Sequence, residues 1–214
     1  MTASGFRDHP NWAYLLQEVR RVYRNTSSGG SKIIREHQRT VGKALSAVHT
    51  VNPSLDFSEP TTLPVCAHLD RALDNGKLGP MASFARAVER IRDVLAWRYG
   101  YESVPPKLAD RYAYCELAGP RGPMITEEII IGLVLFAPRC TYPQHSHRGI
   151  TESYVAISGA FSENDLGVYA PGSIIFNRAA EVHRITTGQT EPCLLLYAWT
   201  GTAATLRDDR LTFD

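Results

Sequence analysis

The spacing of apolar residues divides the chain into two parts that meet near residue 105. In the first part, apolar positions recur at intervals of three and four residues, as on the buried face of an amphipathic helix. The first such stripe ends at a Ser-Ser-Gly-Gly break over 27–30 and consists of Trp12, Leu15, Leu16, Val19, Val22 and Tyr23. Similar stripes bounded by proline or glycine predict further helices at about 31–49, 63–74 and 80–98. We expect these helices to build the fold and to carry no chemistry.

After residue 105 the pattern changes to short runs rich in β-branched and aromatic residues, which favour strands. Turn-forming residues, such as those at 162–165 and Gly188, separate the runs. The predicted strands are 112–117, 125–136, 152–158, 167–169, 173–176 and 193–199. Many short strands with regular turns indicate a barrel or a sandwich. The sequence therefore predicts a mainly β fold with α: a helical region over 1–105 and a β-barrel domain over 106–214.

Alternation within the run 152–158 predicts which side chains face the barrel interior. If Glu152 and Tyr154 point inward, Val155 and Ile157 must point outward, because successive side chains of a strand lie on opposite faces. Outward apolar side chains need a cover. The N-terminal helices, or a second subunit in a homodimer, would provide it.

Histidine and glutamate residues in the second part have the spacing of metal ligands. His145 and His147 are two residues apart, so on a strand both imidazoles project from the same face. Glu152 follows a short connection and brings a carboxylate back across the pair, and His183 completes the set from a distant strand. Neutral imidazole and carboxylate suit zinc, iron, manganese, cobalt or nickel, whereas calcium and magnesium prefer oxygen ligands. The sequence thus predicts one divalent transition-metal ion without choosing among these metals.

The composition and charge of the chain limit the kinds of binding partner that we expect. The chain has 214 residues, 43% hydrophobic and 21% charged, which is ordinary for a globular protein, and a formal net charge of +1. The basic residues are scattered, so we expect neither nucleic acid nor an anionic membrane as a partner. The first residues lack an apolar leader, and no run reaches the roughly 18 apolar residues of a membrane span. We therefore expect a cytoplasmic protein with a small-molecule substrate.

The segments that hold the four candidate ligands resemble the two motifs of the cupin superfamily: His145-x-His147 through Glu152 to Gly159, and Pro171-Gly172 through His183. Arg139 stands where the first motif usually opens with glycine, and Asn177 where the second usually has proline. Both are backbone positions and not ligands. The resemblance implies that residues 106–214 form the double-stranded β-barrel of the cupins.

Two tyrosines narrow the resemblance further. Tyr142 precedes the first histidine by three residues, and Tyr154 follows the glutamate by two, on the same face of its strand. The pattern Tyr142-x-x-His145-x-His147, then Glu152-x-Tyr154 and His183, resembles the cupin-type dimethylsulfoniopropionate lyases of marine bacteria. The resemblance covers 112–201 with motifs, and 1–105 by architecture alone.

This resemblance implies a carbon–sulfur lyase that splits dimethylsulfoniopropionate into dimethyl sulfide and acrylate by β-elimination. Tyr154 matches the tyrosine of the family motif that acts as base, and Tyr142 would orient the substrate or assist as a second acid or base. Aromatic faces suit a sulfonium group, so Trp199 and Tyr197 are candidates for substrate contacts, although Trp199 fits the barrel core equally well. Two alternatives use the same ligands: an iron-dependent cupin dioxygenase and a non-catalytic ligand-binding cupin.

Overall fold

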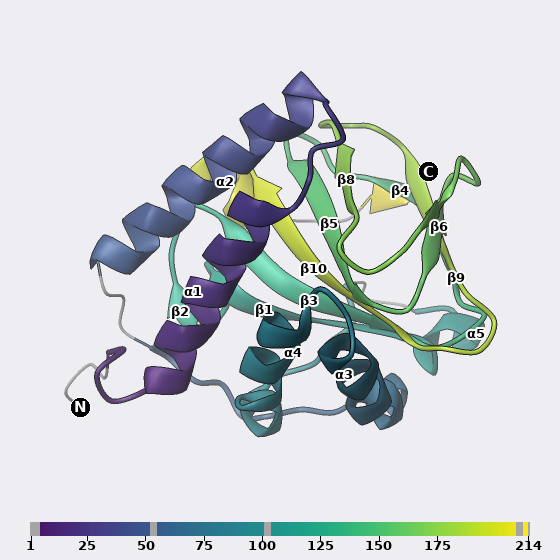
Figure 1. Ribbon diagram of the computed structural model, residues 1–214, viewed down its shortest axis with the longest axis horizontal. Coiled ribbons are helices and arrows are strands. Elements are labelled where there is room, and N and C mark those ends of the chain that lie inside the picture. The colour runs from purple at the N-terminus through teal and green to yellow at the C-terminus, as the bar shows by residue number, and fades with distance from the viewer. Residues whose placement is uncertain (1–4, 52–54, 101–103, 209–211, 214) are drawn as a thin grey trace.

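The computed structural model describes residues 5–51, 55–100, 104–208 and 212–213, and most of its helices precede the sheets along the chain (Figure 1). The first helix starts with Pro10, whose fixed φ and missing N–H suit the first helical turn. The helices are α1 (Pro10–Asn25), α2 (Lys32–Val51), α3 (Leu69–Lys77), α4 (Ala82–Glu89), α5 (Pro106–Ala109) and α6 (Ala203–Arg207), with 3₁₀ turns η1 (Pro64–His68) and η2 (Arg92–Val94).

The helix predicted over 80–98 is wrong beyond its first half. It ends at Glu89, and after a 3₁₀ turn the backbone becomes extended at Leu95. Ala96 and Arg98 then form β-bridges, to Thr61 and Tyr114. The apolar stripe continues through this segment because its residues still face the same core, so periodicity alone could not reveal the change of conformation.

Two sheets make up the rest of the fold, and the predicted combination of a β-sheet region with preceding helices is confirmed. The six-stranded sheet has the order β2-β1-β3-β10-β5-β8 and the five-stranded sheet the order β11-β4-β9-β6-β7; all pairs are antiparallel except β1 with β2. The strands are β1 (Tyr112–Gly119), β2 (Met124–Ile125), β3 (Ile130–Phe136), β4 (Thr141–Ser146), β5 (Thr151–Ser158), β6 (Phe161–Glu163), β7 (Val168–Tyr169), β8 (Ile174–Asn177), β9 (His183–Thr187), β10 (Cys193–Thr200) and β11 (Thr212–Phe213). The predicted strand 125–136 is split between β2 and β3, and the predicted turn at 162–165 begins only after Glu163.

The predicted alternation along β5 is confirmed. Tyr154 belongs to the apolar cluster between the two sheets, whereas Val155 and Ile157 belong to the cluster that includes the N-terminal helices. In Figure 1, α1 and α2 run side by side across one face of the six-stranded sheet. The helices of the same chain therefore provide the cover that these outward side chains require, and no second subunit is needed for it.

A buried polar network ties α1 and α2 to the strand that carries Glu152. The Oγ of Ser153 lies 3.0 Å from the hydroxyl of Tyr23 and 2.8 Å from Nε2 of His37, and all three side chains are buried. Burial lowers the pKa of His37 to about 4, so its ring is neutral at neutral pH. With Nε2 of His37 as acceptor, donation from Tyr23 to Ser153 and from Ser153 to His37 gives each of these three atoms a partner.

We expect Ser153→Ala to lower the free energy of unfolding by about 1–3 kcal/mol, because it leaves the Tyr23 hydroxyl and the His37 Nε2 buried without their shared partner. Denaturant unfolding measures the change. Ser58→Ala, at an exposed position, serves as the matched control and should alter stability by less than about 0.5 kcal/mol. Equal stability of the two variants would show that the network contributes nothing to holding β5 against the helices.

Positive backbone angles explain one glycine and one departure from the cupin motifs. Gly159 has φ 71°, and a Cβ there would lie 2.3 Å from the carbonyl oxygen of Pro192, so only glycine fits. Arg139 also takes a left-handed conformation, φ 58°, which glycine adopts at lower cost. The turn before β4 therefore keeps its shape with arginine in place of the usual glycine, at some cost in backbone strain.

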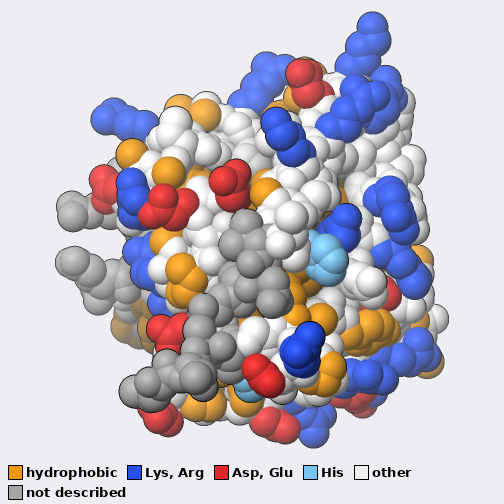
Figure 2. Space-filling model, turned by 90° about the vertical axis from the view of Figure 1, so that its left-hand side faces the viewer, with side chains coloured by type: hydrophobic (Ala, Val, Ile, Leu, Met, Phe, Trp, Pro, Cys, Tyr) orange, Lys and Arg blue, Asp and Glu red, His pale blue; other side chains and the backbone are white. Residues whose placement is uncertain are grey.

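The surface agrees with the modest net charge. Figure 2 shows basic side chains spread along one face, with acidic and apolar side chains among them. Among the described helices, none combines the length and the apolarity that a membrane crossing requires.

Candidate metal centre

Three strands bring the four predicted ligands together inside the barrel. β4 carries His145 and ends just before His147, β5 carries Glu152, and β9 begins with His183. One ligand atom from each residue lies within 4.8 Å of the others, and all four residues are buried. The Oε2 atom of Glu152 lies 2.9 Å from Nε2 of His183 and 3.5 Å from Nε2 of His147. This group could hold a metal ion.

Backbone carbonyls fix the rings of two of the histidines. The Nδ1–H of His145 donates to the carbonyl of Pro143 at 2.8 Å, and that of His183 to the carbonyl of Glu181 at 3.1 Å. Because a carbonyl only accepts, Nδ1 carries a proton in both rings, which leaves Nε2 as the atom that can bind a metal when the ring is neutral. The Nε2 atoms of His147 and His183 are buried and make no hydrogen bond within the described residues. A metal ion would satisfy these lone pairs, so the residues present fit the ion.

The pKa shifts of the same residues favour metal binding. Burial, reinforced by His183, lowers the pKa of His145 to about 3 and keeps that ring neutral. Burial alone would raise the pKa of Glu152, but His147 and His183 outweigh it and hold this pKa well below its usual range. The site therefore contains an ionised carboxylate among imidazoles at neutral pH, which is a donor set suited to a divalent transition metal.

Glu152 is itself held by two neighbours on the adjacent strands. The register of the six-stranded sheet places Trp199 on one side of it and Asn177 on the other. The indole N–H of Trp199 donates to Oε1 at 2.6 Å, and the Trp199 ring packs 4.6 Å from that of His147. Asn177 Nδ2 lies 3.5 Å from Oε2 and 2.9 Å from the carboxylate of Glu163. The sequence did not predict that Trp199 and Asn177 would contact a ligand.

We expect Trp199→Phe to weaken metal affinity or activity by about 10- to 100-fold, because the carboxylate of Glu152 loses its shortest hydrogen bond. Competition with a chromophoric chelator measures the affinity, and steady-state assays measure kcat. Trp97→Phe, which alters a buried tryptophan in the helix-facing cluster, should leave both quantities unchanged. If both variants behave alike, the indole N–H does not orient Glu152.

The two tyrosines of the predicted site lie on the interior side of the barrel near the ligands. The ring of Tyr154 is 6.3 Å from that of His183, and the ring of Tyr142 meets His145 edge-on at 4.7 Å. The Tyr142 hydroxyl lies 3.4 Å from the hydroxyl of Tyr112, a residue that sequence reasoning missed. Tyr112 stands far from the motifs along the chain, and no spacing signal connects it to them.

Tyr197 lies next to Tyr154, at the paired position of β10. It is buried, and it covers Gly132 on β3, where an added Cβ would come within 2.4 Å of the Tyr197 hydroxyl. Burial, with a contribution from Glu116, raises the pKa of Tyr197 well above 10, so this phenol stays protonated. Tyr142, Tyr154, Tyr197 and Trp199 thus belong to one interior cluster.

Comparison with known proteins identifies the family. A family model described as dimethylsulfoniopropionate lyase matches residues 36–195, about three-quarters of the chain. The chain belongs to the dimethylsulfoniopropionate lyase family. The predicted family and enzyme class, a carbon–sulfur lyase, are therefore confirmed.

Curated and solved relatives of this lyase family agree with the assignment. A protein of Cereibacter sphaeroides, named provisionally as the dimethylsulfoniopropionate lyase DddL, is 53% identical over 194 residues, 91% of this chain and 84% of that protein. A chain from crystal structures of the lyases RdDddP and RnDddQII has a TM-score of 0.66 at 23% identity, covering 96% of this chain and 98% of its own. The lyase DddQ of Ruegeria pomeroyi has a TM-score of 0.59 at 22% identity, covering 77% and 90%. At this identity, the two structures show the shared fold.

Proposed function

We propose that this lyase-family chain cleaves dimethylsulfoniopropionate to dimethyl sulfide and acrylate by a metal-dependent β-elimination, with Tyr154 as the base. The observation that carries the proposal is the buried set of three histidines and one glutamate with tyrosines around it, in a chain of this family. Its 53% identity to a protein named for the same substrate supports the choice of substrate.

The metal centre formed by the four ligands would bind the carboxylate of the substrate. A divalent transition metal held by His145, His147, Glu152 and His183 supplies Lewis acidity toward that carboxylate and thereby acidifies the adjacent C–H bond. The backbone carbonyls that bind His145 and His183, and the indole that binds Glu152, keep the ligands in place before substrate arrives. The protein thus contributes a preorganised site, and little rearrangement is needed on binding.

Tyr154 would perform the proton transfer. As a phenolate, its oxygen removes a proton from the carbon next to the carboxylate; the electron pair becomes the double bond of acrylate, the carbon–sulfur bond breaks, and neutral dimethyl sulfide leaves. Tyr154 belongs to the interior cluster and lies two residues after Glu152 on β5, so base and ligand would share one face of that strand. Tyr197 is a poor candidate for this step, because its raised pKa keeps it protonated.

The remaining aromatic residues would position the substrate. Tyr142, held between Tyr112 and His145, would orient the substrate or assist as a second acid or base. Tyr197 and Trp199, whose ring centroids lie 5.4 Å apart, would offer their faces to the sulfonium group. Aromatic faces attract the cation without forming the tight ion pair that would retain it, so the leaving group can depart as a neutral sulfide.

Headspace measurement of dimethyl sulfide, with acrylate measured in parallel, tests the proposed function. The purified metal-loaded protein is incubated with dimethylsulfoniopropionate under air and again without oxygen. We expect equal release of both products in both atmospheres. Product formation that consumes oxygen would favour an iron-dependent dioxygenase, and binding without turnover at full metal occupancy would favour a ligand-binding cupin.

A further inference from the structure

The candidate metal ligands come from both sheets. Glu152 lies on β5 of the six-stranded sheet, whereas His145 and His183 lie on β4 and β9 of the five-stranded sheet. The distance between the carboxylate and these imidazoles therefore depends on how the two sheets are held together at this place. A side-chain hydrogen bond that links the sheets beside Glu152 would help to determine the geometry of the ligand set.

Asn177 and Glu163 form such a link. Asn177 ends β8, the edge strand of the six-stranded sheet, and pairs with Glu152 on β5. Glu163 ends β6 of the five-stranded sheet and pairs with Ile185, two residues after His183 on β9. The Nδ2 atom of Asn177 donates to Oε1 of Glu163 at 2.9 Å, which connects the two sheets directly. We call this hydrogen bond the sheet tie.

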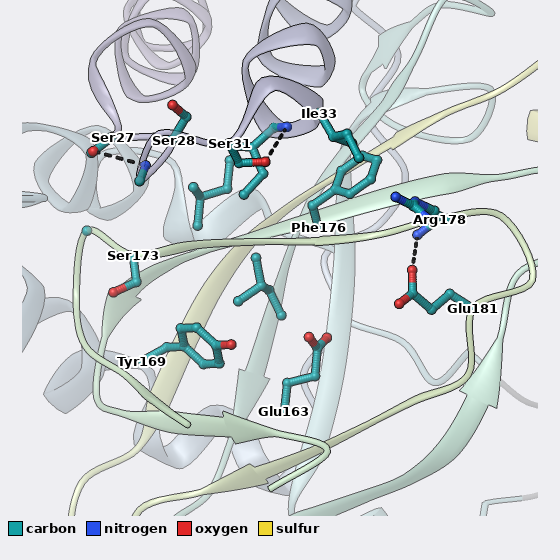
Figure 3. A pocket seen from close by; sticks show the side chains of 15 residues that line it. Ser27, Ser28, Ser31, Ile33, Glu163, Tyr169, Ser173, Phe176, Arg178 and Glu181 are labelled. Carbon is teal, nitrogen blue, oxygen red and sulfur yellow. Dashed lines mark hydrogen bonds between the residues drawn. The ribbon is translucent and has the colours of Figure 1, made fainter. Parts of the chain in front are cut away.

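The sheet tie lies on the interior side of β8. Figure 3 shows Phe176 projecting from one side of this strand and Glu163 on the other side, and the ring of Phe176 packs 5.0 Å from that of His37 on α2. Asn177 directly follows Phe176, so its side chain points to the side of Glu163. Asn177 is 3% exposed and Glu163 is 8% exposed. Water therefore competes little for this hydrogen bond.

Two carboxylates fix the orientation of the Asn177 amide. Its Nδ2 atom lies 2.9 Å from Oε1 of Glu163 and 3.5 Å from Oε2 of Glu152. In the reversed orientation the amide oxygen would face both carboxylates, and two acceptors repel each other. Glu163 thus keeps an N–H of Asn177 directed at Glu152. The contact with Glu152 is long for a hydrogen bond, so Asn177 should hold this carboxylate less firmly than Trp199 does.

The oxygen that Asn177 approaches is the one that faces the histidines. Oε2 of Glu152 lies 2.9 Å from Nε2 of His183 and 3.5 Å from Nε2 of His147, whereas Oε1 accepts the hydrogen bond from Trp199. Asn177 also stands where the second cupin motif usually has proline, whose side chain has no hydrogen-bond donor. This departure from the motif therefore supplies a donor beside the oxygen that is placed to bind a metal.

We propose that Glu163 and Asn177 are positioning residues of the metal centre: Glu163 orients the Asn177 amide, and Asn177 holds Oε2 of Glu152 in place between the two sheets. The inference rests on the proposed metal-dependent function and deepens it, because it gives a role to a carboxylate outside the ligand set. Glu163 also interacts electrostatically with His183. Its effect on orientation must therefore be measured separately from the effect of its charge.

Cobalt substitution separates these two effects. The visible absorption of bound Co²⁺ depends on the arrangement of its ligands, whereas its affinity also depends on nearby charge. The intact protein is loaded with Co²⁺ in the absence of substrate, and competition with a chromophoric chelator gives the affinity per folded protein. We expect Asn177→Ala to shift the absorption bands and to weaken the affinity by about tenfold. Glu163→Ala should shift the bands in the same way, because the amide loses its anchor.

Glu163→Gln keeps an acceptor for Asn177 and removes the charge, so it should weaken the affinity while the absorption bands stay like those of the wild type. Asn75→Ala is the matched control, because Asn75 donates to the carboxylate of Glu191 at 2.7 Å outside the metal centre. Its loss should leave the bands and the affinity unchanged.

Wild-type bands and affinity in Asn177→Ala would overturn the proposal. Bands that shift equally in Glu163→Gln and Glu163→Ala would also overturn it, because the charge and not the orientation of Asn177 would then be responsible. The two Glu163 variants keep the test decisive if Asn177→Ala does not fold. Since no substrate is present, a protein that binds cobalt but releases no dimethyl sulfide would refute the proposed reaction and not this inference.

Discussion

Tyr154→Phe is expected to lower kcat by about 10²- to 10⁴-fold while metal content stays equal to that of the wild type. The change removes one oxygen atom and leaves the four ligands, the ring and its place among the interior aromatics untouched. The substrate C–H bond then has no base in reach, although the substrate can still bind through its carboxylate. Steady-state assays of dimethyl sulfide release give kcat and KM, and elemental analysis gives the metal content.

Two further hydroxyl deletions make the result specific. Tyr142→Phe should act mainly on KM if Tyr142 orients the substrate, because its hydroxyl is shared with Tyr112. Tyr197→Phe should have the smallest effect on kcat, since the phenol of Tyr197 stays protonated and therefore does not serve as the base. If Tyr154→Phe retains substantial kcat while Tyr142→Phe loses it, the base is Tyr142 and the assignment drawn from the family motif is wrong.

The sequence predicted the parts of the fold that follow from local pattern. Helices α1 and α2 appear where three- and four-residue spacing placed them, because each buries one apolar stripe on the sheet. The alternation in β5 predicted its two faces, since a strand has no freedom to rotate one side chain without its neighbours. The end of the helix at Glu89 could not be predicted in this way, because it depends on β-bridges of Ala96 and Arg98 to segments distant in sequence.

The site shows the same division between local and distant information. His145, His147 and Glu152 lie close together along the chain, so their spacing carried the prediction of a metal centre, which the geometry supports. The contacts of Glu152 with Trp199 and Asn177 depend on the register between strands, which no single segment encodes. Trp199 was predicted to contact substrate through its face. The hydrogen bond from its N–H to Glu152 adds an orienting role that only the structure reveals.

His147→Ala is expected to lower metal occupancy and activity together, by about 100-fold or more in metal affinity. The variant removes a candidate ligand whose buried Nε2 makes no hydrogen bond in the described structure and is therefore available to a metal ion. Metal content after dialysis against a weak chelator, measured beside kcat, checks the prediction. His37→Ala removes a buried histidine outside the ligand group and should reduce stability without reducing metal per folded protein.

Thermal unfolding separates loss of metal from loss of structure in these variants. An ion that binds the folded protein raises its stability by an amount that grows with the ratio of free metal to the dissociation constant, so a strong chelator should lower the Tm of the wild type and of His37→Ala. The Tm of His147→Ala should respond little to the chelator, because little metal is bound. Acid should act in the same direction as the chelator, since ligation needs neutral imidazoles and protons displace the ion as pH falls. If the His147→Ala variant keeps full activity and a chelator-sensitive Tm, His147 is not a metal ligand. The mechanism that relies on the four ligands would then be wrong.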